Sequence, residues 1–297
     1  MIRYTLIQGR DNVDWLGRLN LALDYIEQNL DNEIDFSKAA MLACCSSYQF
    51  QRIFSLISDI TLGEYIRRRR LTCAAFDLAN TEEKIIDIAL KYGYDSPSSF
   101  TRAFQNMHGV TPSAAREKSI YLKSYPRIFF SITIKGDTSM NYKIEEKGAI
   151  RLVGVKRHYR TDNGENFEKI PLFWKEVCEN GTSDKMCKLS SSKSSCLYGA
   201  CADFNDNCVD YYIAVESTAD VPANMSELKI EPATWAVFEC VGPNPEAMQS
   251  VWKRIFTEWF PMSGYEHADA PEIEWYSDGD MMSQTYKSEI WIPVIKK

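Results

Sequence analysis

Two nine-residue segments that lie fifty positions apart carry side chains able to contact DNA. The positions concerned are Ser47, Tyr48, Gln51 and Arg52 in the first segment, and Pro97, Ser98, Thr101 and Arg102 in the second. Hydroxyl, amide and guanidinium groups of this kind make contacts to base edges and phosphates in protein–DNA interfaces. The pattern therefore predicts two helices that read DNA. The alternative is a pair of ordinary amphipathic helices whose polar faces are merely solvated.

Each segment has the features of a helix that begins after a serine. Ser46 and Ser96 stand where an N-cap hydroxyl would accept a hydrogen bond from a free backbone N–H. Apolar residues then recur at i, i+3 and i+4, which gives each helix one buried face. These apolar residues are Phe50, Ile53 and Phe54, and in the second segment Phe100, Ala103 and Phe104. A self-match at a fixed offset indicates one structural unit that is built twice.

The surrounding residues complete two helix-turn-helix units. Apolar periodicity predicts further helices over residues 14–30, 35–43, 62–78 and 82–92. The turns into the two DNA-contacting helices fall at Cys44–Cys45 and at Gly93, where glycine tolerates a left-handed backbone. Pro112 would start a last short helix. In a helix-turn-helix, the second helix of each unit enters the major groove.

Four consecutive arginines, at positions 67–70, lie on the helix that would connect the two units. Residues 1–120 carry 14 basic against 15 acidic residues, and residues 121–297 carry 20 against 26. Neither half is basic overall, so these arginines would form a local basic stripe on an acidic body. We expect at least one of the four to contact a DNA phosphate, and we name Arg70 as the DNA-binding member. The alternative is that Arg70 braces the connecting helix.

Composition describes an ordinary globular chain of two or three domains, with 297 residues, 45% of them hydrophobic and 25% charged. No apolar run reaches the roughly 18 residues of a membrane span, and the first ten residues lack a signal-peptide core. We therefore expect a cytoplasmic protein without membrane contact. Nine scattered cysteines, no C-x-x-C pair and three histidines favour free thiols over disulfides or a zinc site. We expect neither a metal nor a cofactor.

The chain changes to a strand pattern near residue 140. Strands are predicted over residues 142–147, 151–159, 196–203, 211–216, 233–241, 273–276 and 289–294, and helices over 165–179 and 245–259. After the first strand, this order reads βαββ twice. Two such halves related by a pseudo-twofold axis leave a groove between them, which is a default ligand site.

The last strands of the two predicted halves match each other in sequence. Asp210 is then equivalent to Glu289, and Tyr212 to Trp291. An acid two residues before an aromatic residue lies with it on the same face of a strand. We expect Glu289 and Trp291 to line the groove. The alternative is that Glu289 is a surface residue and Trp291 belongs to the core.

Residues 15–116 resemble the DNA-binding domain of the AraC/XylS family of bacterial transcription regulators. The match is carried by Ser46-x-x-x-Phe50-x-Arg52-x-Phe54, Arg70-Leu71-x-x-Ala74, Ile88-Ala89-x-x-x-Gly93-Tyr94, Ser96-x-x-x-Phe100-x-Arg102-x-Phe104 and Gly109-Val110-Thr111-Pro112. The resemblance implies two recognition helices in successive major-groove segments about 34 Å apart, with double-stranded DNA and RNA polymerase as partners. Tyr48, Gln51 and Arg52 would face bases. The short side chains of the second recognition helix would position on phosphates more than they discriminate bases.

The second half of the chain is similar to the GyrI-like effector-binding domains of some AraC-family regulators. The residues that carry this likeness are Pro271-Glu272-Ile273-Glu274-Trp275-Tyr276 and Ser288-Glu289-Ile290-Trp291-Ile292-Pro293-Val294. It implies a cleft with a buried acid and aromatic walls, which binds a hydrophobic or cationic organic molecule. A desolvated carboxylate needs a positive partner, and aromatic rings add cation–π attraction. We expect Glu289 as the acid, lined by Trp291, Trp235, Tyr276, Tyr212 and Phe173.

These observations predict a multidomain protein, with an all-α double helix-turn-helix domain followed by an α+β domain of two βαββ repeats. The expected limits are 1–120 for the DNA-binding domain, 121–139 for a connecting segment and 140–297 for the effector-binding domain. The predicted function is a ligand-responsive, sequence-specific transcription regulator, and not an enzyme. Two alternatives for the second domain are a small-molecule hydrolase and a protein-interaction module.

Overall fold

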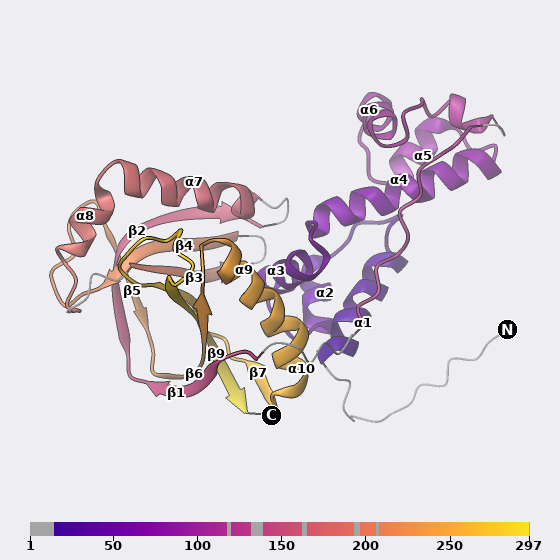
Figure 1. Ribbon diagram of the computed structural model, residues 1–297. Coiled ribbons are helices and arrows are strands. Elements are labelled where there is room, and N and C mark those ends of the chain that lie inside the picture. Colours follow the sequence, from indigo (N-terminus) through magenta and orange to yellow (C-terminus); the bar gives the residue numbers. More distant parts are fainter. Residues whose placement is uncertain are drawn as a thin grey trace.

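The computed structural model describes residues 15–117, 120–131, 139–161, 165–192, 197–205 and 208–296. Part of the predicted connecting segment, residues 132–138, lies outside these ranges. The first part of the described chain is helical (Figure 1). Its helices are α1 (Trp15–Gln28), α2 (Phe36–Leu42), α3 (Ser47–Ser58), α4 (Leu62–Asn80), α5 (Ile85–Lys91), α6 (Pro97–His108) and a 3₁₀ turn, Ala114–Arg116.

Serine caps start the two predicted recognition helices, α3 and α6, as the sequence indicated. The Ser46 hydroxyl accepts a hydrogen bond from the Gln49 amide at 3.2 Å, and the Gln49 side chain accepts one from the Ser46 amide at 2.9 Å. This reciprocal capping box satisfies two backbone donors at the helix end. In α6 the Ser96 hydroxyl accepts from the Ser99 amide at 3.2 Å. Local side-chain chemistry thus fixes where both helices begin.

The turns that precede these helices use two different residues for one backbone conformation. Gly93 has a φ of +78°, as its sequence position predicted, and Cys44 reaches +54° without being glycine. Two helix boundaries differ from expectation. The helix predicted to begin at residue 82 is α5, which begins at Ile85. Thr81, just before the predicted start, caps the end of α4. The segment after Pro112 forms only the short 3₁₀ turn.

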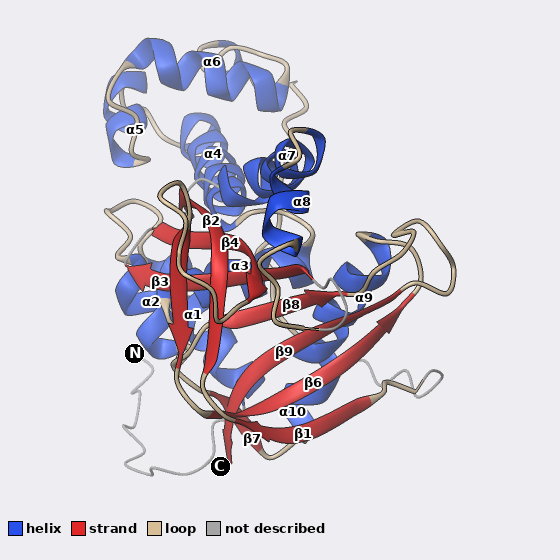
Figure 2. Ribbon diagram, turned by 90° about the vertical axis from the view of Figure 1, so that its left-hand side faces the viewer, coloured by secondary structure: helices blue, strands red, loops and turns tan. Residues whose placement is uncertain are grey.

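The second part of the chain is a curled antiparallel sheet with helices on one side (Figure 2). Its strands are β1 (Tyr142–Lys147), β2 (Ile150–Arg160), β3 (Leu197–Asn205), β4 (Cys208–Glu216), β5 (Ser226–Ile230), β6 (Ala233–Val241), β7 (Tyr265–His267), β8 (Glu272–Tyr276) and β9 (Lys287–Lys296). Its helices are α7 (Glu165–Glu179), α8 (Thr182–Cys187), α9 (Glu246–Arg254), a π-helical turn (Ile255–Trp259) and α10 (Phe260–Met262). The strand order is β1-β6-β9-β8-β3-β4-β2-β5, and β7 pairs with β9.

All seven predicted strands and both predicted helices of this part are present, with ends that shift by a few residues. Two strands were missed. β5 is five residues long and carries the alternating sequence SELKI at the edge of the sheet. β7 has only three residues. Both are too short and too polar for periodicity to reveal them.

The two faces of the sheet have different surroundings. Directly paired residues of neighbouring strands share a face, and so do residues two apart on one strand. The pairs Tyr211–Cys201, Cys201–Glu272 and Glu274–Ile290, with Glu272 and Glu274 both on β8, therefore place these five residues on the same face. Helices α7 and α9 pack on this side, which we call the helix-covered face. The opposite side, the far face, buries its own apolar cluster. That cluster includes Tyr198, Ala200, Tyr212, Trp235, Ile273 and Trp291.

One hydrophobic core joins the first helix-turn-helix unit to the sheet. It runs from Leu23 of α1 and Phe54 of α3 to Phe256 of the π-helical turn and Ile292 of β9. The second unit has a separate core around Phe100 and Phe104, closed by residues of α4 and α5. Both views place α5 and α6 at the outer end of α4, away from the sheet (Figure 1, Figure 2). The first unit is therefore docked on the sheet, and the second unit projects from it.

Candidate functional site

The second recognition helix, α6, presents its polar face to solvent. Pro97, Ser98 and Arg102 are exposed and Thr101 is half-buried. These four residues line a shallow hollow of about 450 Å³ together with Gln105 and Asn106. This face is accessible to DNA in the described conformation.

The first recognition helix, α3, is covered by the sheet domain. Tyr48, Gln51 and Arg52 expose 2%, 3% and 8% of their surface, and Ser47 is also buried. DNA cannot reach these side chains while the two parts of the chain are docked. No pattern near α3 predicts this cover, because the covering residues lie some 150 to 220 positions further along the chain.

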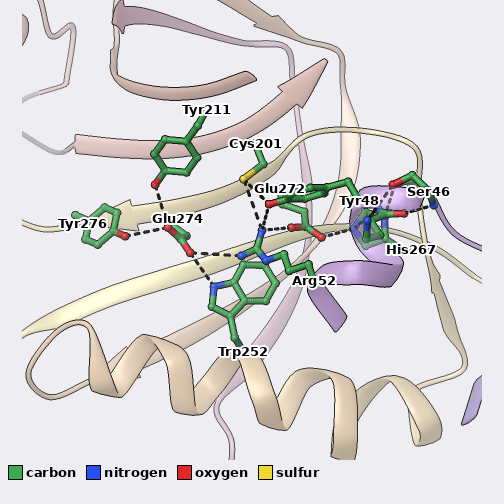
Figure 3. Close-up of polar contacts among 12 residues, drawn as sticks. Ser46, Tyr48, Arg52, Cys201, Tyr211, Trp252, His267, Glu272, Glu274 and Tyr276 are labelled. Atoms are coloured by element: carbon green, nitrogen blue, oxygen red, sulfur yellow. Dashed lines mark hydrogen bonds and ion pairs between the residues drawn. The ribbon is translucent and has the colours of Figure 1, made fainter. Parts of the chain in front are cut away.

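Arg52 is the centre of the contact between α3 and the sheet (Figure 3). Its Nη1 donates to Glu272 Oε2 at 2.6 Å and to the Tyr48 hydroxyl at 3.1 Å. Its Nη2 lies 3.6 Å from Glu274 Oε1, and its guanidinium carbon lies 4.0 Å from the centre of the Trp252 indole. Two carboxylates and an aromatic face are the surroundings that proteins provide for a bound organic cation.

Glu274 is held by three aromatic side chains. Its Oε1 accepts from Trp252 Nε1 at 2.8 Å, and its Oε2 accepts from the hydroxyls of Tyr276 at 2.9 Å and Tyr211 at 3.3 Å. Burial, and after it the charge of Glu274, hold the pKa of Tyr276 and of Tyr211 well above the usual range. Both phenols therefore remain hydrogen-bond donors at every physiological pH. Trp174 completes this wall, packing against Tyr276 with ring centres 4.9 Å apart.

Glu272 is more deeply buried, and its side chain is 1% exposed. It also accepts a hydrogen bond from His267 Nε2 at 3.0 Å. Burial alone would raise the pKa of this carboxyl group, but the charge of Arg52 and the bond from His267 outweigh burial and lower it. Glu272 is therefore a carboxylate at neutral pH. We call the group formed by Glu272, Glu274, Trp252, Tyr211, Tyr276 and Trp174 the seam site, since it lies where β3 meets β8.

The expected effector-binding residues are split between the two faces of the sheet. Tyr276 and Phe173 lie on the helix-covered face, and Tyr276 belongs to the seam site. Glu289, Trp291, Trp235 and Tyr212 lie on the far face, because Glu289 pairs with Trp275 and Ile290 pairs with Glu274. No single cavity on one face can be lined by both sets.

Glu289 nevertheless has a polar environment of its own. Its carboxylate accepts from Trp291 Nε1 at 2.6 Å, and it borders a surface hollow of about 490 Å³ with Glu239 and Trp275. Trp291 itself packs in the far-face cluster, with its ring centre 6.3 Å from that of Trp235. Their spacing correctly predicted that Glu289 and Trp291 share one face of a strand. It did not predict which face of the sheet the helices cover.

The residues of the seam site were not singled out from the sequence, apart from Tyr276. A signal was present in the motif Glu272-Ile273-Glu274-Trp275-Tyr276, where two acids and a tyrosine alternate and so share one face of a strand. Two acids on the inward face of a central strand require a positive partner. That partner is Arg52.

The arginine run on α4 has intramolecular partners throughout. Arg70 donates from Nε to the carbonyl of Leu30 at 2.8 Å and from Nη2 to that of Asn32 at 2.7 Å. Arg67 and Arg68 pair with Glu64. Arg69 pairs with Glu27 at 2.9 Å. Arg70 thus ties α4 to the turn after α1, which is the bracing role weighed against phosphate contact.

The described residues include no helix long and apolar enough to cross a membrane. Within the same ranges, no group of three or more histidine, cysteine, aspartate or glutamate side chains is arranged to hold a metal ion.

A double helix-turn-helix joined to a sheet domain with an aromatic, acidic site defines a class of transcription regulators with a small-molecule-binding domain. Comparison with family models agrees with this class. Residues 39–118 match a helix-turn-helix domain of the AraC type, and residues 140–295 match the GyrI-like small molecule binding domain. The chain belongs to the AraC-family regulators that carry a GyrI-like domain.

Individual relatives match one part of the chain each. The transposon Tn10 TetD protein of Escherichia coli is 43% identical over 97 residues, which is 33% of this chain and 70% of TetD. The regulatory protein SoxS of Salmonella typhimurium is 38% identical over 96 residues, 32% of this chain and 90% of SoxS. A solved structure of SAV2435 bound to tetraphenylphosphonium is 27% identical, with a TM-score of 0.48, and covers 52% of this chain and 94% of that one.

Proposed function

We propose that this protein is a DNA-binding transcription regulator whose effector is a small organic cation bound at the seam site. The observation that carries the proposal is that Glu272 and Glu274, surrounded by aromatic rings, already hold a cation, the guanidinium of Arg52. A site with this chemistry favours a positively charged, partly hydrophobic molecule over a neutral or anionic one.

The position of the site fits a sheet built from two related halves. One half is β2-α7-β3-β4 and the other is β6-α9-β8-β9, and the strand order reads β6-β9-β8 and then β3-β4-β2. We assign to the two halves a pseudo-twofold relation, with the seam site on the axis between β8 and β3. We keep the domain limits 1–120 and 140–297, joined by residues 121–139.

The DNA-reading residues in this proposal are those of the two recognition helices. Ser47, Tyr48, Gln51 and Arg52 act from α3, and Pro97, Ser98, Thr101 and Arg102 act from α6. The exposed face of α6 supports the second set directly. The first set can act only after α3 leaves the sheet.

RNA polymerase is the further partner that we propose, with activation of transcription as the outcome. Support comes from a relative named HTH-type transcriptional activator AarP, from Providencia stuartii, which is 43% identical over 94 residues. Run-off transcription with purified polymerase, with and without the effector, tests this part. The proposal describes a binding protein and not an enzyme. Recovery of the effector at unchanged mass after incubation with the protein is the expected result.

The effector site is tested with tetraphenylphosphonium as a lipophilic cation, followed by quenching of tryptophan fluorescence. Glu274→Gln should weaken binding about tenfold or more, since a buried charge-assisted contact is worth roughly 1.5–3 kcal/mol. Glu289→Gln distinguishes binding at the far face from binding at the seam site, because Glu289 and Glu274 lie on opposite faces of the sheet. If it weakens binding while Glu274→Gln does not, the effector lies at the far-face hollow instead. Glu227→Gln on the outer strand β5 serves as the matched control.

A further inference from the structure

The arginines of the two helix-turn-helix units occupy the same motif position in opposite surroundings. Arg102 of α6 is exposed and lines the hollow on that helix. Arg52 of α3 is buried, and it fills the space between Glu272, Glu274 and the Trp252 ring. The motif alone does not cause this difference. It arises because the sheet domain supplies two acids and an aromatic surface to one arginine only.

The cover over α3 leaves some of its polar groups poorly satisfied. The Ser47 hydroxyl and the Gln51 amide nitrogen are buried, and neither finds a hydrogen-bond partner among the described residues. Burying such groups without partners costs free energy. A helix designed only to pack on the sheet would not carry them. The docked state is therefore held mainly by the Arg52 contacts and the apolar core, against the cost of these polar groups.

The acids of the seam site lose a cation when α3 leaves the sheet. The charge of Arg52 is the main influence that lowers the pKa of Glu272 against its burial, and a shielded carboxylate without a counter-charge is strongly unfavourable. A free organic cation bound between Glu272, Glu274 and Trp252 would take over this role. It could not bind there while the guanidinium lies 2.6 Å from Glu272 and 4.0 Å from the Trp252 ring centre. Arg52 and the effector thus require the same space.

We infer that Arg52 is an internal competitor of the effector, so that binding of a flat, delocalised cation such as a guanidinium or amidinium releases α3 to read DNA. This inference rests on the proposed effector site. Because one site cannot hold both cations, effector binding and docking of α3 are linked, and each opposes the other by the same factor. The effector raises DNA affinity, and DNA in turn raises effector affinity.

Docking is tested first without any effector, using the full chain and a duplex selected from a random-sequence pool. Glu272→Gln removes the charge that holds Arg52 and leaves all residues of α3 intact. It should bind the duplex at least tenfold more tightly than the parent, while Glu227→Gln behaves as the parent. Thermal unfolding establishes that the variant is folded. Lys253→Glu provides a second route, because it turns the exposed pair between Lys253 and Asp59, 2.8 Å apart, into a repulsion without touching the buried site.

Lys253→Glu should raise DNA affinity by a smaller factor, since that pair is partly solvated. If both variants are folded and neither binds DNA more tightly than the parent, the docking of α3 does not limit DNA binding and the inference is overturned.

Competition is tested with phenylguanidinium and tetraphenylphosphonium as probes. Arg52→Ala keeps both acids and removes the internal cation, so it should bind phenylguanidinium at least tenfold more tightly than the parent. Equal affinities in the two proteins would overturn the inference. Failure of both probes to bind to either protein would instead overturn the proposed effector site. The Glu272→Gln result on DNA then still decides whether α3 is held back by docking.

Discussion

The guanidinium of Arg52 and the carboxylate of Glu272 lie 2.6 Å apart, although 220 residues separate them in the sequence. One residue belongs to a helix of DNA-reading type and the other to the ligand-binding sheet. The pair is nearly shielded from solvent, with side chains 10% and 1% exposed. This buried ion pair therefore joins a helix of the DNA-reading type to the ligand-binding sheet.

Arg102→Ala should reduce affinity for the selected duplex by roughly 1–3 kcal/mol, with and without a bound cation, because α6 is exposed in the docked state. Fluorescence anisotropy with a labelled duplex measures this loss. If Arg102 reads a base, the variant loses affinity only for duplexes that carry the preferred base at one position of the binding sequence. An equal loss on every sequence identifies a phosphate contact. Unchanged affinity on all duplexes would remove Arg102 from the interface.

Chemical labelling should distinguish the buried thiol of Cys201 from exposed thiols. Burial, opposed by the charge of Arg52, raises the pKa of Cys201 to about 12, so little thiolate forms at pH 8. Cys44 and Cys178 are exposed. Iodoacetamide followed by peptide mass analysis should modify Cys44 and Cys178 before Cys201. Glu272→Gln should speed modification of Cys201 at least tenfold, and no change in its rate would mean that α3 stays in place.

Docking should be insensitive to pH through the neutral range and should fail only in acid. The pKa of Glu272 is lowered below its ordinary value of 4.5 because the charge of Arg52 and the bond from His267 outweigh burial. The ion pair thus contributes its full stabilisation at every pH above 4.5, the ordinary pKa of the carboxyl group. The contribution is lost as the pH falls through the lowered pKa. Small-angle scattering between pH 7.5 and 3.5 should show the chain expanding only at the acid end. Expansion already at pH 6 would assign the change to another group.

Removal of the N-cap hydroxyl should destabilise the first helix-turn-helix unit measurably. Ser46→Ala breaks the capping box with Gln49 and should lower the free energy of unfolding by about 1 kcal/mol. Ser96→Ala is the matched change in the second unit, where the hydroxyl also accepts from a backbone amide. Denaturant unfolding of both variants provides the values. A negligible effect of Ser46→Ala would mean that docking on the sheet, rather than capping, stabilises α3.

Local features of the chain were predictable, and contacts between distant segments were not. The caps at Ser46 and Ser96, the turn at Gly93 and the long strands follow from side chains within a few residues of each element. The burial of Arg52 depends on Glu272, whose own face is set by pairing between β3 and β8. Periodicity placed Glu289 and Trp291 on one face correctly. It contains no information about which face α7 and α9 would cover.

The exposed position of α6, at the far end of the stiff helix α4, has a consequence for how the protein occupies DNA. A docked molecule is still able to touch a duplex through one recognition helix. Once α3 is freed, it joins a duplex that its neighbour already holds, at a high effective concentration set by α4. The cation then raises the number of recognition helices bound to the duplex from one to two. Such a protein would bind DNA weakly through α6 alone as it moves along the chromosome. It would stay bound only at a sequence that α3 also recognises.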